Sequence, residues 1–147
     1  MLLNKPELIA IEALSDDSIK IEDLLNPPEP YSVIYISTHS NQDWLAVEVF
    51  EDSLAGESKR DKRFTELVNR YGNYFNATHF HNSYAIGISP EGIKKLFNNP
   101  KSLVIVQGCS SENHARAFVS AGAAAAIGTK DNVSHNDAAF QLTHFRF

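Results

Sequence analysis

The chain has 147 residues and a formal net charge of −5 at pH 7, with 43% hydrophobic and 21% charged residues. This size fits a single globular domain over residues 1–147, and the acidic balance excludes a general attraction to the phosphates of nucleic acid. No run approaches the roughly 18 apolar residues of a membrane span, and the single cysteine cannot form an internal disulfide. We therefore expect a cytoplasmic protein with neither a nucleic acid nor a membrane as partner.

The first half of the chain predicts helices and strands separated by clear breaks. Asn26-Pro27-Pro28 ends one short amphipathic helix, and Gly72 ends a second helix. The polar stretch around Gly56 predicts a surface loop between them. The expected elements are a strand or helix start at 8–11, a helix at 17–25, strands at 32–38 and 44–50, a loop at 51–62, a helix at 64–71 and a strand at 84–88.

The second half continues this alternation. Ser89 and Pro90 form an N-cap and a first helical residue, and Gly122 marks a break. The expected elements are a helix at 90–97, a strand at 103–106 that leads to Cys109, a helix at 115–119, a strand at 123–128 and a last helix from about 134 to 145. Continuous apolar strands separated by helices indicate an α/β fold whose sheet is mostly parallel and covered on both faces.

Two of the predicted strands each end beside one half of a cysteine–histidine pair. The strand at 32–38 runs directly into His39, and the strand at 103–106 is followed closely by Cys109. Parallel strands deliver their carboxyl ends to the same edge of a sheet, so these side chains form a candidate catalytic dyad. A thiolate is the reactive form of cysteine, and an imidazole can take its proton or protonate a leaving amine.

Backbone amides near the dyad are candidates for stabilising negative charge. The stretch after Cys109 begins a helix, whose unpaired amides favour both a thiolate and the oxyanion of an acyl-transfer intermediate. The amides of Ser40 and Cys109 are the candidate oxyanion donors. Without catalysis, Cys109 would be a small buried side chain and His39 a hydrogen-bonded residue at a strand end.

Other histidines offer competing sites. His114 follows Cys109 by five positions and is a rival partner for the thiol. His79 and His81 have the spacing of two ligands on one strand face, but no nearby cysteine or carboxylate completes a metal site. We therefore expect no metal and treat His79 and His81 as surface residues.

The motifs around the dyad resemble the CHAT family of caspase-like domains. The cysteine half of that family is matched by Leu-Val-Ile-Val-Gln-Gly-Cys at 103–109, by 115–123 and by Ile-Gly-Thr at 127–129. Its histidine half is matched by Glu-Ala at 12–13, which leads to Ile-Glu-Asp-Leu-Leu at 21–25, and by Tyr-Ile-Ser-Thr-His at 35–39. The similarity runs from about residue 10 to the C-terminus, although 44–84 matches only in pattern.

This resemblance implies a caspase-like three-layer α/β sandwich in which Cys109 is the nucleophile of peptide-bond hydrolysis and His39 its partner. It also implies substrate contacts at Gln107, Asp131 and Ser134, and a role in bacterial signalling or defence. The family is often associated with helical repeats, so the expected partners are a peptide or protein substrate, a second copy of the chain or a helical-repeat protein. It implies no cofactor.

Several departures from the family bear on activity. Ser40 stands where the family usually has glycine, and residues 130–135 replace the usual Leu-Trp-Pro-Val-Asp-Asp, whose paired acids receive a basic P1 side chain in related proteases. Asp131 is a substitute for these acids or a solvated turn residue. The 70 positions between His39 and Cys109, against roughly 50 in caspases, argue against a true caspase. The chain also stops where relatives continue, so we interpret it as a C-terminally truncated or degenerate member or as part of a larger assembly.

Two main functional hypotheses follow. The first is a caspase-like cysteine endopeptidase that works through an acyl-thioester intermediate. The second is a catalytically inactive caspase-like module that binds a peptide or protein through the same cleft or an open sheet edge. An unrelated flavodoxin-like or nucleotide-binding fold is disfavoured, because no glycine-rich phosphate loop follows an early strand.

Overall fold

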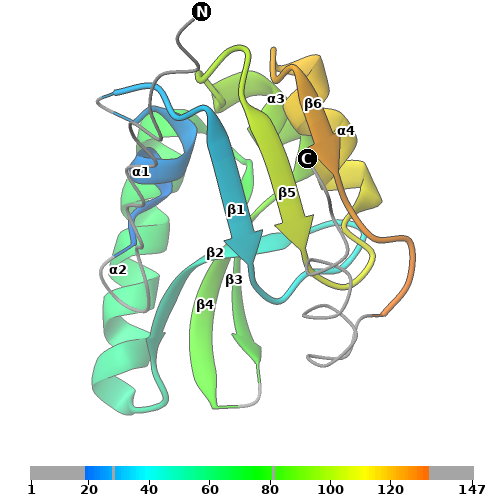
Figure 1. Cartoon of the computed structure of the whole chain (residues 1–147). Coiled ribbons are helices and arrows are strands. Elements are labelled where there is room, and N and C mark those ends of the chain that lie inside the picture. The colour runs from blue at the N-terminus through cyan, green and yellow to red at the C-terminus, as the bar shows by residue number, and fades with distance from the viewer. Residues whose placement is uncertain (1–18, 28, 81, 133–147) are drawn as a thin grey trace, which may run out of the picture.

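Two small sheets organise the part of the chain that the structure describes, which comprises residues 19–27, 29–80 and 82–132 of a computed structural model (Figure 1). The elements are α1 (Ile21–Leu25), β1 (Val33–Ser37), β2 (Leu45–Glu51), α2 (Leu54–Tyr71), β3 (Phe75–Phe80), β4 (Ser83–Ile88), α3 (Pro90–Leu96), β5 (Leu103–Gln107), α4 (Glu112–Ser120) and β6 (Ala125–Ile127). Sheet A is parallel with the order β1-β5-β6, and sheet B is antiparallel with the order β2-β4-β3. The predicted α/β class and parallel sheet are confirmed.

Sheet A is covered by helices on one face. The strands β1, β5 and β6 follow one another across the sheet in chain order. Because the crossovers between parallel strands are right-handed, the helices α3 and α4 that precede β5 and β6 lie on the same side. Both lie behind sheet A in Figure 1. Val33 and Tyr35 on the opposite face are 54% and 48% exposed. Within the described residues, helices thus lie on one face of sheet A, and these residues do not show a three-layer sandwich.

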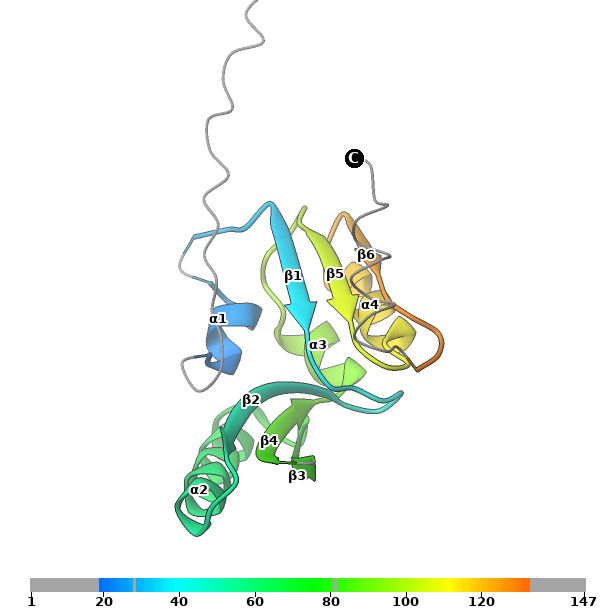
Figure 2. The same cartoon turned by 60° about the horizontal axis from the view of Figure 1, so that its bottom comes forward.

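Sheet B lies beyond the carboxyl ends of the strands of sheet A and packs against α2 (Figure 2). One hydrophobic cluster joins the two sheets, since it contains Leu45 and Ile88 from sheet B together with Val104 and Val106 from sheet A. Phe118 of α4 extends this cluster and is completely buried. The second sheet therefore packs against the edge of sheet A at which the predicted dyad lies.

The largest error in the predicted elements concerns 51–62, which belongs mostly to α2 rather than to a loop. Ser53 caps α2 by accepting a hydrogen bond from the Gly56 amide at 3.0 Å. Gly56 itself is explained by a close approach, because a Cβ there would strike the backbone of Glu51 at the end of β2. The sequence of this segment resembles that of a loop because most of its residues are polar, and the side of the helix that is buried becomes evident only from the tertiary packing.

Strand β3 was not expected, whereas the other described strands lie close to their predicted ranges. The predicted break at Gly72 follows the last residue of α2, and Ser89 caps α3 with Pro90 at its first position, as expected. The predicted elements at 8–11 and 134–145 lie outside the described residues.

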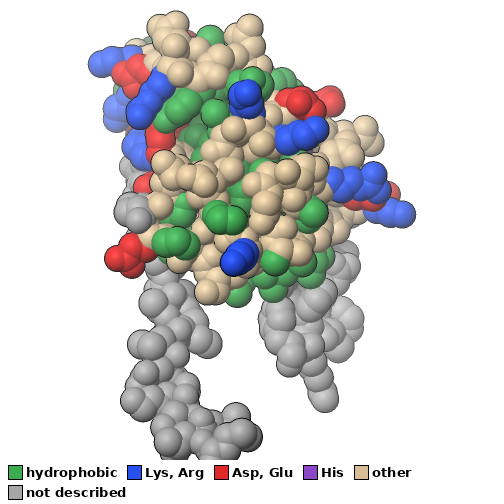
Figure 3. Space-filling view, turned by 90° about the horizontal axis from the view of Figure 1, so that it is seen from above, with side chains coloured by type: hydrophobic (Ala, Val, Ile, Leu, Met, Phe, Trp, Pro, Cys, Tyr) green, Lys and Arg blue, Asp and Glu red, His purple; other side chains and the backbone are tan. Residues whose placement is uncertain are grey.

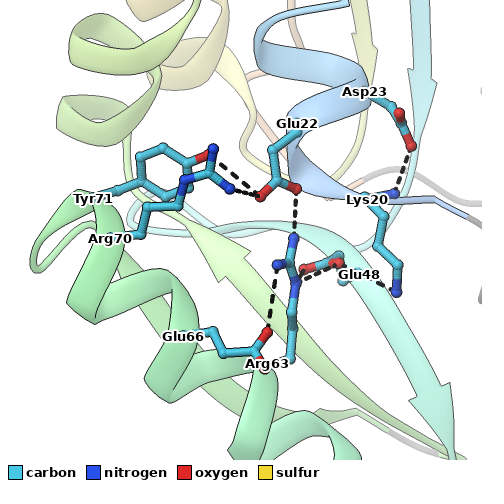
Figure 4. A network of polar contacts seen from close by, with 8 residues as sticks. All are labelled: Lys20, Glu22, Asp23, Glu48, Arg63, Glu66, Arg70 and Tyr71. Carbon is cyan, nitrogen blue, oxygen red and sulfur yellow. Dashed lines mark hydrogen bonds and ion pairs between the residues drawn. The ribbon is translucent and has the colours of Figure 1, made fainter.

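A network of charges attaches α1 and β2 to α2 (Figure 4). Arg63 of α2 donates from Nε to both carboxylate oxygens of Glu48 at 3.0 Å, and it also binds Glu22 of α1. Glu48 lies on β2 and is 1% exposed. Burial raises the pKa of Glu48, and Arg63 and Lys20 oppose that rise.

Candidate functional site

The ends of β1 and β5 lie side by side. Their parallel register runs from Val33 opposite Leu103 to Ser37 opposite Gln107, and the Thr38 amide donates to the Gln107 carbonyl at 3.1 Å. His39 and Cys109 each come two residues after the last strand pair. The structure therefore brings together the two strand ends that the sequence singled out.

His39 is exposed, and residues of sheet B contact both its ring and its backbone. Its ring stacks on Phe80 of β3, with 5.5 Å between ring centroids and 26° between the planes. Its carbonyl oxygen accepts a hydrogen bond from the Ala46 amide at 3.0 Å. The sequence did not indicate Phe80 as a neighbour, because β3 was not predicted and the contact joins residues 41 positions apart.

Ser40 forms a direct bond between the two strand ends. Its hydroxyl donates to the Cys109 carbonyl at 2.7 Å. Its backbone pairs with Leu45 in an antiparallel bridge whose hydrogen bonds are donated by the Asn41 and Ala46 amides. The Ser40 amide is thus not a donor in that bridge. The Ser40 side chain, which stands where the resembled family has glycine, links the loop after β1 to the turn at Cys109.

The turn that carries Cys109 is backbone-strained and closely held. Cys109 is partly exposed, and Ser110 adopts a φ of 49°, which a residue with a Cβ rarely occupies. The Ser110 amide donates to the Asp131 carbonyl at 3.0 Å, and the Glu112 amide donates to the Thr129 carbonyl at 3.1 Å. The expectation that the amides after Cys109 are unpaired is therefore wrong for these two, because the chain after β6 already occupies them.

The predicted substrate-contacting residues differ in their placement. Gln107 is the last residue of β5, and its Oε1 is buried with no hydrogen-bond partner in the described part of the chain. Asp131 is exposed and lies beside the Cys109 turn through its carbonyl contact with Ser110. Ser134 lies outside the described residues. Gln107 and Asp131 therefore flank Cys109, one along the strand and one across the turn.

His114 is completely buried and acts as an anchor for the loop after His39. It lies in α4, and its Nε2 is 2.8 Å from the carbonyl oxygen of Asn41, which the neutral ring reaches as a donor. Burial lowers the pKa of His114, while the Asn41 and Trp44 backbone and the Asp43 carboxylate act in the opposite direction. The sequence presented His114 as a rival partner for the thiol, whereas its Nε2 contacts backbone instead.

This burial predicts that the fold loses stability as the solution is acidified. A neutral His114 has a folded pKa below the unfolded value of about 6.5, so the unfolded state binds more protons and stability falls as the pH drops below that value. The slope approaches about 1.4 kcal/mol per pH unit for one proton. Urea unfolding between pH 7.5 and 5.5 should show this fall in the natural chain and a weaker fall in His114→Gln. Equal slopes in the two proteins would contradict this assignment.

The remaining histidines do not form a metal centre in the described ranges. His79 on β3 lies 2.9 Å from the Asp52 carboxylate and packs against Tyr84, and His81 is outside the described residues. Among the residues described, no group of three or more histidine, cysteine, aspartate or glutamate side chains could hold a metal ion.

No described helix has the length and apolar character to cross a membrane.

Charge is mixed on the face seen from above, where basic and acidic side chains lie near one another among uncharged and hydrophobic ones (Figure 3). That face therefore carries no broad basic surface of the kind that binds a phosphate backbone.

No family model, curated protein or solved structure matches this chain.

Proposed function

We propose that this chain is a caspase-like cysteine endopeptidase with Cys109 as nucleophile and His39 as its catalytic partner. The observation that carries this proposal is the position of both residues two places beyond the register pair Ser37–Gln107, on neighbouring parallel strands. The resemblance to CHAT domains supplies the reaction and the finer fold assignment. The assignment to a caspase-like sandwich belongs to the same proposal, as do a cytoplasmic location and a part in bacterial signalling or defence.

The proposed reaction has two steps. The Cys109 thiolate attacks the carbonyl carbon of the scissile peptide bond, and the C–N bond breaks as protonated His39 gives a proton to the leaving amine. Water then attacks the resulting thioester as His39 takes one of its two protons, the C–S bond breaks to release the Cys109 thiolate, and the carboxylic acid product gives its remaining proton to solvent. The Ser40 and Cys109 amides are the proposed donors to the oxyanion of both tetrahedral intermediates. No cofactor is required for this chemistry.

Intact-mass labelling with peptidyl electrophiles that differ at P1 tests the proposal. We expect a single P1-selective adduct at Cys109, which is the only cysteine, and none in Cys109→Ala. Loss of general acid–base assistance should slow labelling of His39→Ala by about 10²- to 10⁴-fold. His79→Ala is the matched control, because His79 is a partly exposed histidine that pairs with Asp52 instead, and it should react like the natural chain.

Iodoacetamide provides the reference reaction, since it needs an accessible thiol but no peptide cleft. Labelling by iodoacetamide without labelling by a peptidyl electrophile at any P1 would contradict the peptidase and favour the binding module. Loss of reaction with both reagents in His39→Ala but not in His79→Ala would instead show that His39 sets the reactivity of the thiol toward any electrophile, without a role specific to peptides.

The second candidate, a non-catalytic binding module, is favoured by the exposed edge of sheet A. β6 is an edge strand among the described strands, and a groove runs between it and α4. The groove is apolar along Val119, Ala126 and Ile127, with charged side chains from Glu112, Arg116 and Lys130. An extended peptide could add to this edge through backbone hydrogen bonds and place alternate side chains in the groove.

A further inference from the structure

The two peptide groups that flank Cys109 are both held by side-chain hydroxyls. The Gly108 carbonyl accepts a hydrogen bond from the Thr129 hydroxyl, and the Cys109 carbonyl accepts one from the Ser40 hydroxyl at 2.7 Å. Ser40 comes from the loop after β1, and Thr129 comes from the chain after β6. Two segments far apart in sequence therefore orient the backbone on both sides of the thiol.

Thr129 is itself tied to the turn that it holds. Its amide donates to the Ser111 hydroxyl at 3.0 Å, and the Ser111 hydroxyl donates to the Val106 carbonyl at 3.0 Å. The Thr129 carbonyl accepts from the Glu112 amide. The backbone and side chain of Thr129 thus contact the turn at several points.

Packing around Gly108 shows how closely the Ser40 loop approaches. A Cβ at Gly108 would lie 2.8 Å from the Thr38 carbonyl oxygen and still closer to the Ser40 hydroxyl oxygen. There is no room for a side chain between the two strand ends. The Ser40 hydroxyl fills the space beside Gly108 and hydrogen-bonds to the following residue.

The hydrogen bonds from Ser40 and Thr129 lie next to Ser110, whose backbone is in the left-handed region. Ser110 has a φ of 49°, and a non-glycine residue persists at positive φ only where its surroundings hold it. The Ser40, Thr129 and Asp131 contacts surround this residue from both neighbouring loops. We expect that without these contacts the turn leaves this conformation and the thiol changes its position relative to His39.

We propose that Ser40 and Thr129 are positioning residues for Cys109, which act through their hydroxyl groups to hold the thiol in line with His39. The catalytic meaning of this role rests on the proposed peptidase function, whereas the structural role does not. A displacement of about 1 Å at a reacting group lowers rates by about 10²-fold, so loss of either hydroxyl should affect reaction with an oriented substrate far more than reaction with a small reagent.

Variants that remove or keep the hydroxyl separate this role from general stability. Thr129→Val keeps the shape and removes the hydroxyl, Thr129→Ser keeps the hydroxyl, and Ser40→Ala removes the other bond. Thr65→Val is the matched control, because its hydroxyl bonds to the Asp61 carbonyl on the exposed side of α2. The full chain is used throughout.

The first measurement compares the rates at which a peptidyl electrophile and iodoacetamide modify Cys109. We expect Thr129→Val and Ser40→Ala to lower the peptidyl rate by about 10- to 100-fold with little change for iodoacetamide, and Thr129→Ser and Thr65→Val to match the natural chain. A natural rate in both Thr129→Val and Ser40→Ala would overturn the proposal.

Amide exchange across 108–112 gives a second readout that needs no peptidase activity. Exchange at Ser110 and Glu112 should become faster in Thr129→Val and Ser40→Ala but not in Thr129→Ser. If peptidyl electrophiles fail even on the natural chain, the proposed function fails, and faster exchange in these two variants would still establish the structural role. Unchanged exchange in both would overturn the positioning role whatever the outcome for catalysis.

Discussion

Arg63→Met is expected to lower the free energy of unfolding by about 3–5 kcal/mol at neutral pH, because it leaves the buried Glu48 carboxylate without its main partner. The Glu48 side chain is 2% exposed and accepts two hydrogen bonds from Arg63 Nε, whereas Lys20 lies farther away at 3.8 Å. Arg63 also binds Glu22, so the change releases α1 from α2. Urea unfolding at pH 8 is the measurement.

The pH dependence of this loss tests its cause. A carboxyl that is buried without Arg63 gains a still higher folded pKa, so protonation in the folded state recovers stability as the pH falls toward that value. The loss in Arg63→Met should therefore be smaller at pH 5 than at pH 8. An equal loss at both pH values would attribute the effect to packing instead of to the buried charge.

Two further variants act as controls for Arg63. The double variant Glu48→Met/Arg63→Met removes both charges and should be much more stable than Arg63→Met alone, since a buried ion pair often exchanges for apolar side chains at little cost. Arg70→Met removes a cation that is 69% exposed and 3.8 Å from Glu22, and it should cost at most about 1 kcal/mol. A double variant as unstable as the single one would contradict the interpretation.

Phe118→Ala is expected to cost about 3–5 kcal/mol, because it opens a cavity where α3 and α4 meet behind sheet A. Phe118 is 0% exposed and packs edge to face on Phe97, with ring centroids 4.9 Å apart and an interplanar angle of 84°. Chemical denaturation measures the change. Since Cys109 lies just before α4, the same variant should also slow labelling of the thiol by peptidyl electrophiles.

Val119→Ala is the matched control for Phe118, since the two residues are neighbours in α4 but Val119 is 47% exposed. It should change stability by no more than about 0.5 kcal/mol. Phe118→Leu should cost less than Phe118→Ala, because leucine fills part of the same volume. Equal losses in Phe118→Ala and Val119→Ala would contradict a cost set by core packing, because helix propensity favours alanine at both positions.

The main elements around the candidate site could be predicted from local sequence. The apolar run before Cys109 forms β5, the run before His39 forms β1, and Ser89 with Pro90 begins α3. Each of these signals lies within a few residues of the element that it predicts. Local backbone preferences and apolar runs are sufficient to determine them.

The errors occur where a segment depends on distant neighbours. The first part of α2 is polar enough to resemble a loop, and β3 is a strand because it pairs with β4 to form sheet B. The sequence also does not show that β1, β5 and β6 follow one another across sheet A, which places the described helices α3 and α4 on the same face. The order of strands, and not their existence, decides which face the helices cover.

The sequence by itself determined the α/β class, the parallel strands that end near His39 and Cys109, and the pairing of those two residues as a candidate dyad. Only the tertiary structure decided that Ser40 bonds to the Cys109 carbonyl, that His114 anchors the Asn41 loop, and that the chain after β6 occupies amides next to the thiol. The physical reason is distance along the chain: the Ser40 and His114 bonds join residues 69 and 73 positions apart. Strand and helix signals are local, but a hydrogen bond between two loops exists only when the whole fold brings its donor and acceptor together.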